Sequence, residues 1–203
     1  MSSIIIFGDS ITRGAFDLEK AGWPNRLTTF LWEDNYKKTG FYHMGLDTNI
    51  LGIDGDLVPD ILNRFDWEIK IAEKWGIAKI FFAVGINDSS FENGKKRNNK
   101  KDFKFGLEKL IQKGLEKVKA RDICFIGLTN IDSNIIQDYF EEKRVAEFDQ
   151  IIIDTAEANS CQFISMQGLL EKEDLSDGIH PNSNGHEKMF LQIKEFLISN
   201  KIL

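Results

Sequence analysis

The chain alternates between short runs of apolar residues and longer segments in which apolar residues recur at every third or fourth position. A short continuous apolar run is typical of a strand buried on both faces of a parallel sheet, and the longer period is typical of an amphipathic helix. This pattern predicts strands at residues 4–7, 49–53, 77–84, 123–128 and 162–166. It predicts helices at residues 23–32, 58–75, 103–119, 139–159 and 184–199.

Strand and helix alternate along the whole predicted order, as they do in α/β folds. Such alternation requires right-handed crossovers and places helices on both faces of a parallel sheet. We therefore expect a three-layer sandwich with a five-stranded parallel sheet. The length of 203 residues suits one compact domain over residues 1–203. Ligands of such sheets bind outside the carboxyl ends of the strands, so functional residues are expected to follow strands.

Composition and charge exclude several classes of protein. Hydrophobic residues make up 42% of the chain and charged residues 29%, which excludes disordered, collagen-like and coiled-coil proteins. The net charge of −6 repels nucleic-acid phosphates and anionic lipid headgroups, so we expect neither nucleic acid nor a stable membrane association. The one dense basic run lies in the most polar segment, residues 92–101, which is expected to be a solvated, mobile loop.

Two features of the sequence bear on the cellular compartment of the protein: its two cysteines and its N-terminal residues. Cys124 and Cys161 stand beside apolar residues in predicted strands, so we expect buried free thiols without a redox role, with a disulfide between them left open. The chain begins without a basic segment, and the apolar run at residues 4–7 is too short for a signal peptide or a membrane span. We expect a cytoplasmic protein; its oligomeric state stays open, a homodimer included.

The first predicted strand is followed by the sequence GDSITRG, residues 8–14. It is neither a dinucleotide-binding fingerprint nor a P-loop, so phosphate binding is not indicated. It does place the hydroxyl of Ser10 at the end of a strand, where backbone N–H groups point nearby. Ser10 is thus a candidate nucleophile, and the alternative is a plain helix N-cap.

Two further candidates follow the second and third predicted strands. Gly55 lies in the sequence GIDGD, residues 52–56, where bare backbone can approach a substrate closely; the alternative is an ordinary turn glycine. Asn87 lies in GINDS, residues 85–89, and its amide is a donor suited to a developing oxyanion. The alternative for Asn87 is an Asx turn.

The segment SDGIHPN, residues 176–182, is the most informative part of the sequence about function. Asp177 stands three residues before His180, so its carboxylate can accept from the imidazole Nδ1–H and leave Nε2 free as a base. His186 follows six residues later and allows a metal site made of Asp177, His180 and His186 as an alternative, although no further strand-end ligand joins it.

The four segments together provide what acyl transfer needs: a nucleophile, a base, a group that orients the base, and oxyanion donors. They favour a serine hydrolase. Two other classes of protein are alternatives: a metal-dependent hydrolase and a non-catalytic binding protein that keeps the fold. The presence of Ser10, Asp177 and His180 together argues against the binding protein, since a degenerate chain is expected to have lost at least one of them.

The same segments resemble the SGNH hydrolases, also called the GDSL esterase/lipase family. Its four blocks occur here in the family's order, as GDS at residues 8–10, GIDGD at 52–56, GIND at 85–88 and DGIHPN at 177–182. The sequence GWP at residues 22–24 further resembles small bacterial thioesterase/lysophospholipase-type members. One departure concerns the asparagine that many members carry two residues before the second block, since this chain has Ile50 there and Asn49 one place earlier.

The resemblance implies a flavodoxin-like sheet, Ser10 as nucleophile, His180 as base and Asp177 as the residue that orients it. It also implies an oxyanion hole made of the Ser10 and Gly55 N–H groups and the Asn87 side chain, with no metal and no cofactor. The expected substrates are carboxylic esters or thioesters of small acyl groups, and acetylated carbohydrate is the alternative. Small, soluble substrates are preferred because an acidic chain without a basic amphipathic helix is poorly suited to a lipid surface.

Overall fold

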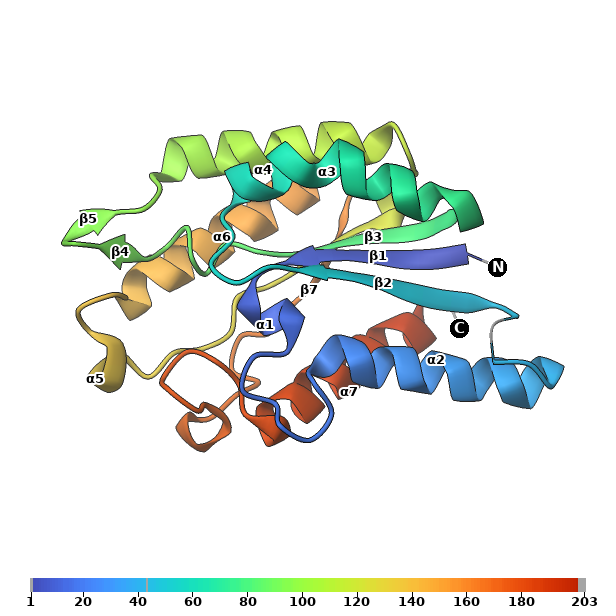
Figure 1. Cartoon of the computed structure of the whole chain (residues 1–203). Coiled ribbons are helices and arrows are strands. Elements are labelled where there is room, and N and C mark those ends of the chain that lie inside the picture. The colour runs from blue at the N-terminus through green and yellow to red at the C-terminus, as the bar shows by residue number, and fades with distance from the viewer. Residues whose placement is uncertain (1, 43, 201–203) are drawn as a thin grey trace.

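The computed structural model describes residues 2–42 and 44–200, and its centre is a parallel sheet of five strands (Figure 1). The strand order is β2-β1-β3-β6-β7, and every neighbouring pair is parallel. The strands are β1 (Ser2–Gly8), β2 (Leu46–Gly52), β3 (Ile77–Ala83), β6 (Ile123–Ile126) and β7 (Gln162–Ile164). The predicted sheet is thereby confirmed, with each predicted strand in its place.

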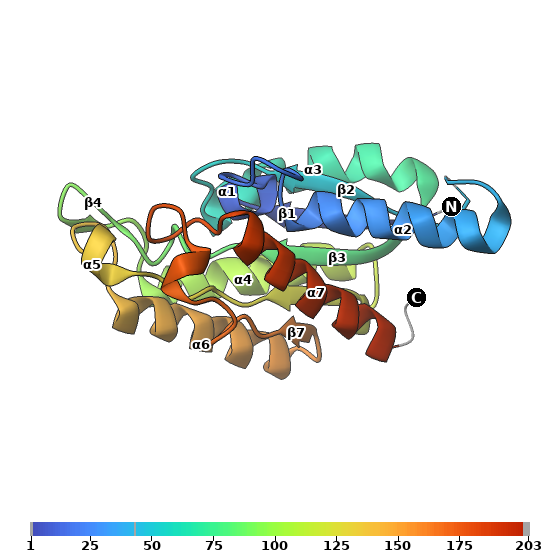
Figure 2. The ribbon, with the colours of Figure 1, turned by 90° about the horizontal axis from the view of Figure 1, so that it is seen from below.

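Helices cover both faces of the sheet and complete the predicted three layers (Figures 1 and 2). One face carries α3 (Val58–Ala72), α4 (Lys100–Leu115) and α6 (Glu142–Ala158). The other carries α1 (Ser10–Arg13), α2 (Trp23–Thr39) and α7 (Ser183–Ser199), with α2 and α7 side by side. The remaining elements are short: β4 (Phe91–Glu92), β5 (Lys95–Lys96), η1 (Glu73–Trp75), η2 (Ala120–Asp122), α5 (Ser133–Ile136) and η3 (Lys172–Asp174). None of the helices in the described residues is long and apolar enough to cross a membrane.

The strand β1 lies at the middle of the apolar core. Its residues Ile4 to Phe7 are completely buried, as the continuous apolar run predicts. The Phe7 ring stacks on Phe65 from α3 at 5.1 Å and on Phe82 from β3 at 5.8 Å between ring centroids. Aromatic packing on this scale fixes the position of the strand, and with it the residues that follow Gly8.

The helix α2 is longer than predicted and continues to Thr39 instead of ending near residue 32. Its last turns are mostly exposed and polar, so they carry no apolar period that the sequence could reveal. Asn35 is the exception: it is buried, and its Nδ2 donates to the carbonyls of Tyr42 and Leu46. β2 begins at Leu46, three residues before its predicted start, because Leu46 already pairs with Ser2 of β1.

The polar segment 92–101 differs from its expected form as a solvated loop. β4 and β5 form an antiparallel hairpin, and α4 already begins at Lys100. The Arg97 N–H donates to the carbonyl of Ser90, and the buried Arg144 guanidinium donates to the carbonyl of Asn98 at 2.5 Å. Most of the segment is exposed, as expected, but the predicted loop was wrong because local polarity reveals neither the hairpin pairing nor the contact with Arg144.

Both cysteines are free thiols. Cys124 is buried as expected, whereas Cys161 is only half-buried because it precedes the edge strand β7. Burial raises the pKa of both thiols, that of Cys161 to about 11. Neither thiol is therefore ionised near neutral pH, in agreement with the expectation that they are inert.

The ends of β1 and β2 approach the helix α1 closely. Gly8 pairs with Gly52, and a Cβ atom placed on Gly52 would lie 2.4 Å from the backbone nitrogen of Arg13 and 2.8 Å from the carbonyl oxygen of Asp9. Only a residue without a side chain fits between strand and helix here. This contact sets the position of the turn that carries Ser10.

Replacing Gly52 tests this contact. We expect Gly52→Ala to lower the free energy of unfolding by about 1–3 kcal/mol or more, because backbone atoms must move to admit the methyl group. Gly40→Ala is a comparison with a different cost: its φ of 77° is unfavourable for alanine, which is not so at Gly52, but a Cβ there would meet no atom within 4 Å. Urea denaturation of each variant against the wild type measures each loss, and an unchanged free energy of unfolding for Gly52→Ala would contradict the close approach.

Asp9 is a buried carboxyl at the start of α1. Its Oδ1 accepts from the Ile11 N–H at 3.0 Å and so caps the helix. Burial, together with the nearby carboxyls of Asp88 and Asp56, raises the pKa of Asp9 from 3.8 to about 7. The folded state therefore favours the protonated form of Asp9 well above the pH at which an unfolded chain would release the proton.

This shift predicts a pH-dependent loss of stability. The contribution of Asp9 to the free energy of unfolding is fully present below its unfolded pKa of 3.8 and is lost as the pH rises from there through about 7. Between these two values, the free energy of unfolding falls by up to about 1.4 kcal/mol per pH unit. Asp9→Asn keeps an oxygen for the Ile11 N–H but cannot ionise. Urea denaturation from about pH 4.5 to about pH 8.5 should show the wild type losing stability relative to this variant up to about pH 7, and then a constant difference. A difference independent of pH throughout would contradict the assignment.

Candidate active site

The structure places Ser10 just after the first strand of the chain, β1, as the sequence predicts. β1 ends at Gly8, the Asp9 side chain caps the next turn, and Ser10 is the first residue of the helix α1. Gly14 then ends the helix in the left-handed conformation, with a φ of 86°. Ser10 is 8% exposed, so its hydroxyl sits in a shallow, mostly enclosed position at the carboxyl edge of the sheet.

A chain of two hydrogen bonds joins Ser10 to His180 and Asp177. Ser10 Oγ lies 2.8 Å from His180 Nε2, and His180 Nδ1 lies 2.8 Å from Asp177 Oδ2. The other carboxylate oxygen of Asp177 accepts from the backbone N–H groups of His180 at 2.9 Å and Ile179 at 3.2 Å. The three predicted residues are thus in contact, and Asp177 holds both the ring and the backbone of His180.

The ionisation of Asp177 decides which ring nitrogen carries the proton. Partial burial acts to raise its pKa, but hydrogen bonds from the backbone and ring of His180 and from Ile179 hold the pKa of Asp177 below its ordinary value of 3.8. An ionised carboxylate cannot donate, so Nδ1–H of His180 donates to it. The lone pair of Nε2 then faces the Ser10 hydroxyl, which donates to it.

Backbone hydrogen bonds close the loop that carries His180. The Ser176 N–H donates to the carbonyl of His180 at 2.8 Å, and the Asp132 N–H donates to the carbonyl of Gly178 at 2.7 Å. Gly178 has a φ of 92° and faces the carbonyl of Asp132, where a side chain would be crowded. The loop is therefore tied to the segment after β6 as well as to itself.

The predicted oxyanion donors follow the three neighbouring strands β1, β2 and β3. Asn87 Nδ2 donates to the carbonyl of Asp56 at 3.2 Å, which places the amide beside the residue that follows Gly55. Gly55 has a φ of 79° with open space where a side chain would be. Within the described part of the chain, the backbone N–H groups of Ser10 and Gly55 donate to no partner, so both are available to a ligand.

Two arginines that the sequence did not single out hold the Gly55 segment. Arg97 Nη2, from the segment after the hairpin, donates to the carbonyl of Gly55 at 3.1 Å. Arg64, from α3, donates to the carbonyls of Leu51 at 2.8 Å and Gly8 at 3.2 Å and pairs with Asp56 at 2.8 Å. No local pattern distinguishes these arginines from other charged residues on a hairpin or a helix.

Asp88, next to Asn87, joins the third strand to α3 and to the hairpin segment. Its carboxylate accepts from the Val58 N–H at 3.1 Å and from Asn98 Nδ2 at 2.6 Å. Burial raises the pKa of Asp88 to about 6, although Asn98, Val58 and Arg97 act to lower it. The Asp88 position in the third motif was the only sequence signal for this network.

His186 does not join a metal site with Asp177 and His180. It is fully buried, its Nδ1 accepts from the Trp23 N–H at 3.3 Å, and its Nε2–H donates to the carbonyl of Ala15 at 3.2 Å. Both ring nitrogens are therefore occupied in joining α7 to the segment between α1 and α2. Among residues 2–42 and 44–200 no group of three His, Cys, Asp or Glu side chains is arranged to hold a metal ion.

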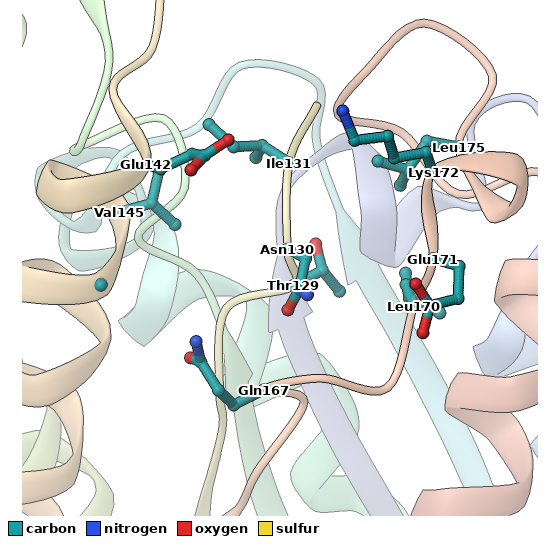
Figure 3. Close-up of a pocket in the computed structure, with 11 residues that line it drawn as sticks. Thr129, Asn130, Ile131, Glu142, Val145, Gln167, Leu170, Glu171, Lys172 and Leu175 are labelled. Carbon is teal, nitrogen blue, oxygen red and sulfur yellow. The ribbon is translucent and has the colours of Figure 1, made fainter. Parts of the chain in front are cut away.

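A separate cavity of about 310 Å³ lies beyond the ends of β6 and β7 (Figure 3). Thr129 and Asn130 line it from the segment after β6, Glu142 and Val145 from α6, and Gln167 from the segment after β7. None of the residues that line this cavity belongs to the Ser10, His180 and Asp177 chain. The chemistry predicted from the sequence is therefore located outside this cavity.

Comparisons with solved structures find the same fold. A lipase/acylhydrolase from Enterococcus faecalis is 22% identical, with a TM-score of 0.76 over 98% of this chain and 97% of that chain. An acetylxylan esterase from Geobacillus stearothermophilus is 20% identical, with a TM-score of 0.74 over 97% of this chain and 92% of that chain. A G-D-S-L family lipolytic protein from Veillonella parvula is 21% identical, with a TM-score of 0.74 over 96% of this chain and 97% of that chain.

The comparison with curated proteins found no match. A family model, in contrast, matches most of the chain, over residues 6–188, and this range contains all four motifs. The chain therefore belongs to the GDSL-like lipase/acylhydrolase family, whose members are carboxylic ester hydrolases.

Proposed function

We propose that this protein hydrolyses carboxylic esters or thioesters of small acyl groups, with Ser10 as nucleophile, His180 as general base and Asp177 as the residue that orients the base. The observation that carries the proposal is the pair of 2.8 Å hydrogen bonds from Ser10 Oγ to His180 and from His180 to Asp177. The acylhydrolase family of the chain supports the same reaction class.

The hydrogen-bonded chain supplies both proton transfers of the reaction. Ser10 Oγ attacks the acyl carbon while His180 Nε2 takes its proton, and the imidazolium then gives that proton to the leaving alcohol or thiol. Water enters next: His180 takes a proton from it as it attacks the acyl-enzyme, and Ser10 recovers its proton when the acid is released. The ionised Asp177 stabilises the imidazolium in both steps.

The oxyanion of each tetrahedral intermediate is assigned to the Ser10 N–H, the Gly55 N–H and the amide of Asn87. The two free backbone N–H groups support this assignment, as does the hydrogen bond from Asn87 to the carbonyl of Asp56, the residue after Gly55. Donors that are already held in place cost no reorganisation when charge develops. Arg97, which donates to the Gly55 carbonyl, contributes to holding the Gly55 segment in place.

Acetylated carbohydrate is the second candidate substrate. The similarity in fold to the acetylxylan esterase from Geobacillus stearothermophilus favours it, and an acetyl group agrees with the preference for small acyl groups. A panel of p-nitrophenyl esters of increasing acyl length, run beside acetylated xylose and an acyl-CoA, separates the ester, carbohydrate and thioester candidates. A metal-dependent hydrolase or a non-catalytic binding protein would show no covalent label from a fluorophosphonate probe in EDTA, whereas the proposed enzyme should be labelled at Ser10.

The nucleophile assignment predicts the outcome of one substitution. Ser10→Ala should lower kcat for p-nitrophenyl acetate by at least about 10³-fold, because no other group can form the acyl-enzyme. The fold should persist, since alanine fits the same turn. Ser199→Ala, on an exposed serine at the end of α7, is the matched control and should keep full activity. Unchanged turnover in Ser10→Ala would overturn the assignment.

The oxyanion assignment predicts a different kinetic signature. Asn87→Ala should lower kcat by about 10²–10³-fold and leave KM nearly unchanged, because the amide is needed most when negative charge has developed. Steady-state kinetics on the same ester measure both constants. A raised KM with an unchanged kcat would instead make Asn87 an ordinary substrate contact.

A further inference from the structure

The aromatic ring of Phe16 stacks on the imidazole of His180. The two ring centroids are 5.0 Å apart, and the ring planes differ by 29°. Phe16 lies in the segment between α1 and α2, only six residues after Ser10, and it is 51% exposed. A large apolar side chain thus lies at the surface with one face on the ring that bonds to Ser10.

The backbone of Phe16 is held in an unfavourable conformation. Its φ is 65°, in the left-handed region that bulky residues rarely occupy because Cβ crowds the backbone. Such strain persists only where the surroundings impose it, and it is concentrated at functional sites. With the backbone in this conformation, the Phe16 ring lies against His180.

Both neighbours of Phe16 are anchored to the body of the protein. The carbonyl of Ala15 accepts from His186 Nε2–H at 3.2 Å, and the Asp17 N–H donates to the carbonyl of Gly14 at 3.2 Å. The His186 ring is fully buried in α7, so this anchor is rigid.

The Asp17 carboxylate provides the stronger anchor. It accepts from the Gly22 N–H at 2.8 Å, from Ser183 Oγ at 2.7 Å and from the buried guanidinium of Arg26. Although burial acts to raise it, these donors hold the pKa of Asp17 well below its ordinary value, so the carboxylate stays ionised and bound. The segment that carries Phe16 is therefore joined to both α2 and α7.

The hydrogen bonds of His180 leave one motion of its ring less restrained. They act at Nδ1 and Nε2, both in the plane of the imidazole, so they oppose a tilt of the ring out of this plane less than a displacement within it. A ring stacked against the face of the imidazole opposes this tilt. The same contact places the quadrupole of the phenyl face beside the positive charge that His180 gains when it takes the Ser10 proton.

We propose that Phe16 is a positioning residue for His180: its ring fixes the plane of the imidazole and stabilises the imidazolium that forms during acyl transfer. This inference rests on the proposed function, because it requires His180 to act as the base. Its effect should appear in the reactivity of Ser10 itself, and not only in the binding of a substrate.

Four variants test the proposal. Phe16→Ala and Phe16→Leu remove the aromatic ring, Phe16→Tyr keeps it, and Leu18→Ala is the control, since Leu18 lies in the same segment and is 97% exposed. Two quantities are measured for each variant: kcat and KM on p-nitrophenyl acetate, and the rate at which a small methyl fluorophosphonate labels Ser10. The fluorophosphonate reports on the Ser10 and His180 pair without needing an acyl or alcohol pocket.

We expect Phe16→Ala and Phe16→Leu to lower kcat and the labelling rate together, by about tenfold to a hundredfold, because small displacements of a reacting group have effects of this size. Phe16→Tyr should restore both quantities, and Leu18→Ala should match the wild type. A raised KM with an unchanged labelling rate would overturn the proposal and make Phe16 a substrate contact. Thermal unfolding of each variant identifies a loss caused by misfolding, which Phe16→Tyr and Phe16→Leu should not show.

The experiment separates this inference from the proposed function. If the wild type is not labelled at Ser10, the serine-hydrolase proposal itself fails. If the wild type is labelled and the Phe16→Ala and Phe16→Leu variants are labelled equally fast, the proposed function stands and the role of Phe16 is wrong.

Discussion

The hydrogen bond between Ser10 and His180 joins two residues that are 170 positions apart in the chain, and the architecture around it keeps that one distance at 2.8 Å. Ser10 follows the buried strand β1, so the aromatic core around Phe7 sets its position. His180 is carried by a loop without regular structure, so its position depends on Asp177 and on backbone bonds to the segment after β6. A rigid strand end and a tightly bonded loop together give the pair its geometry.

Carboxyl groups near this edge of the sheet differ in charge according to their burial and the donors that each one finds. Asp9 accepts from the Ile11 N–H, but burial outweighs this bond and raises its pKa to about 7. Asp177 is surrounded by N–H groups, and Asp17 binds Arg26, so the pKa of each lies below its ordinary value. Asp88 also has donors, but burial outweighs them and raises its pKa to about 6, so the balance between burial and donors decides the charge of each carboxyl group.

The Gly55 segment depends on side chains from other elements. Arg64 reaches it from α3, Arg97 from the segment after the hairpin, and Asn87 from the segment after β3. Each of them binds a backbone carbonyl in or next to this segment, and these bonds hold the segment in place. Loops at the edge of a parallel sheet have few backbone partners of their own, and side chains from neighbouring elements supply the missing ones.

The sequence by itself determined the α/β sheet of five strands, because buried parallel strands are continuously apolar and alternate with helices, whereas the strand order was decided by the tertiary structure. It also located Ser10, Gly55, Asn87, Asp177 and His180, since strand ends and short motifs are local features of the chain. Whether Ser10 and His180 touch was decided only by the tertiary structure, as were the free thiols and the occupied nitrogens of His186. Some features could not be predicted, because each depends on a partner brought near by folding and leaves no periodic or spaced signal in the chain. They are the extra turns of α2, the hairpin and the roles of Arg64, Arg97 and Phe16.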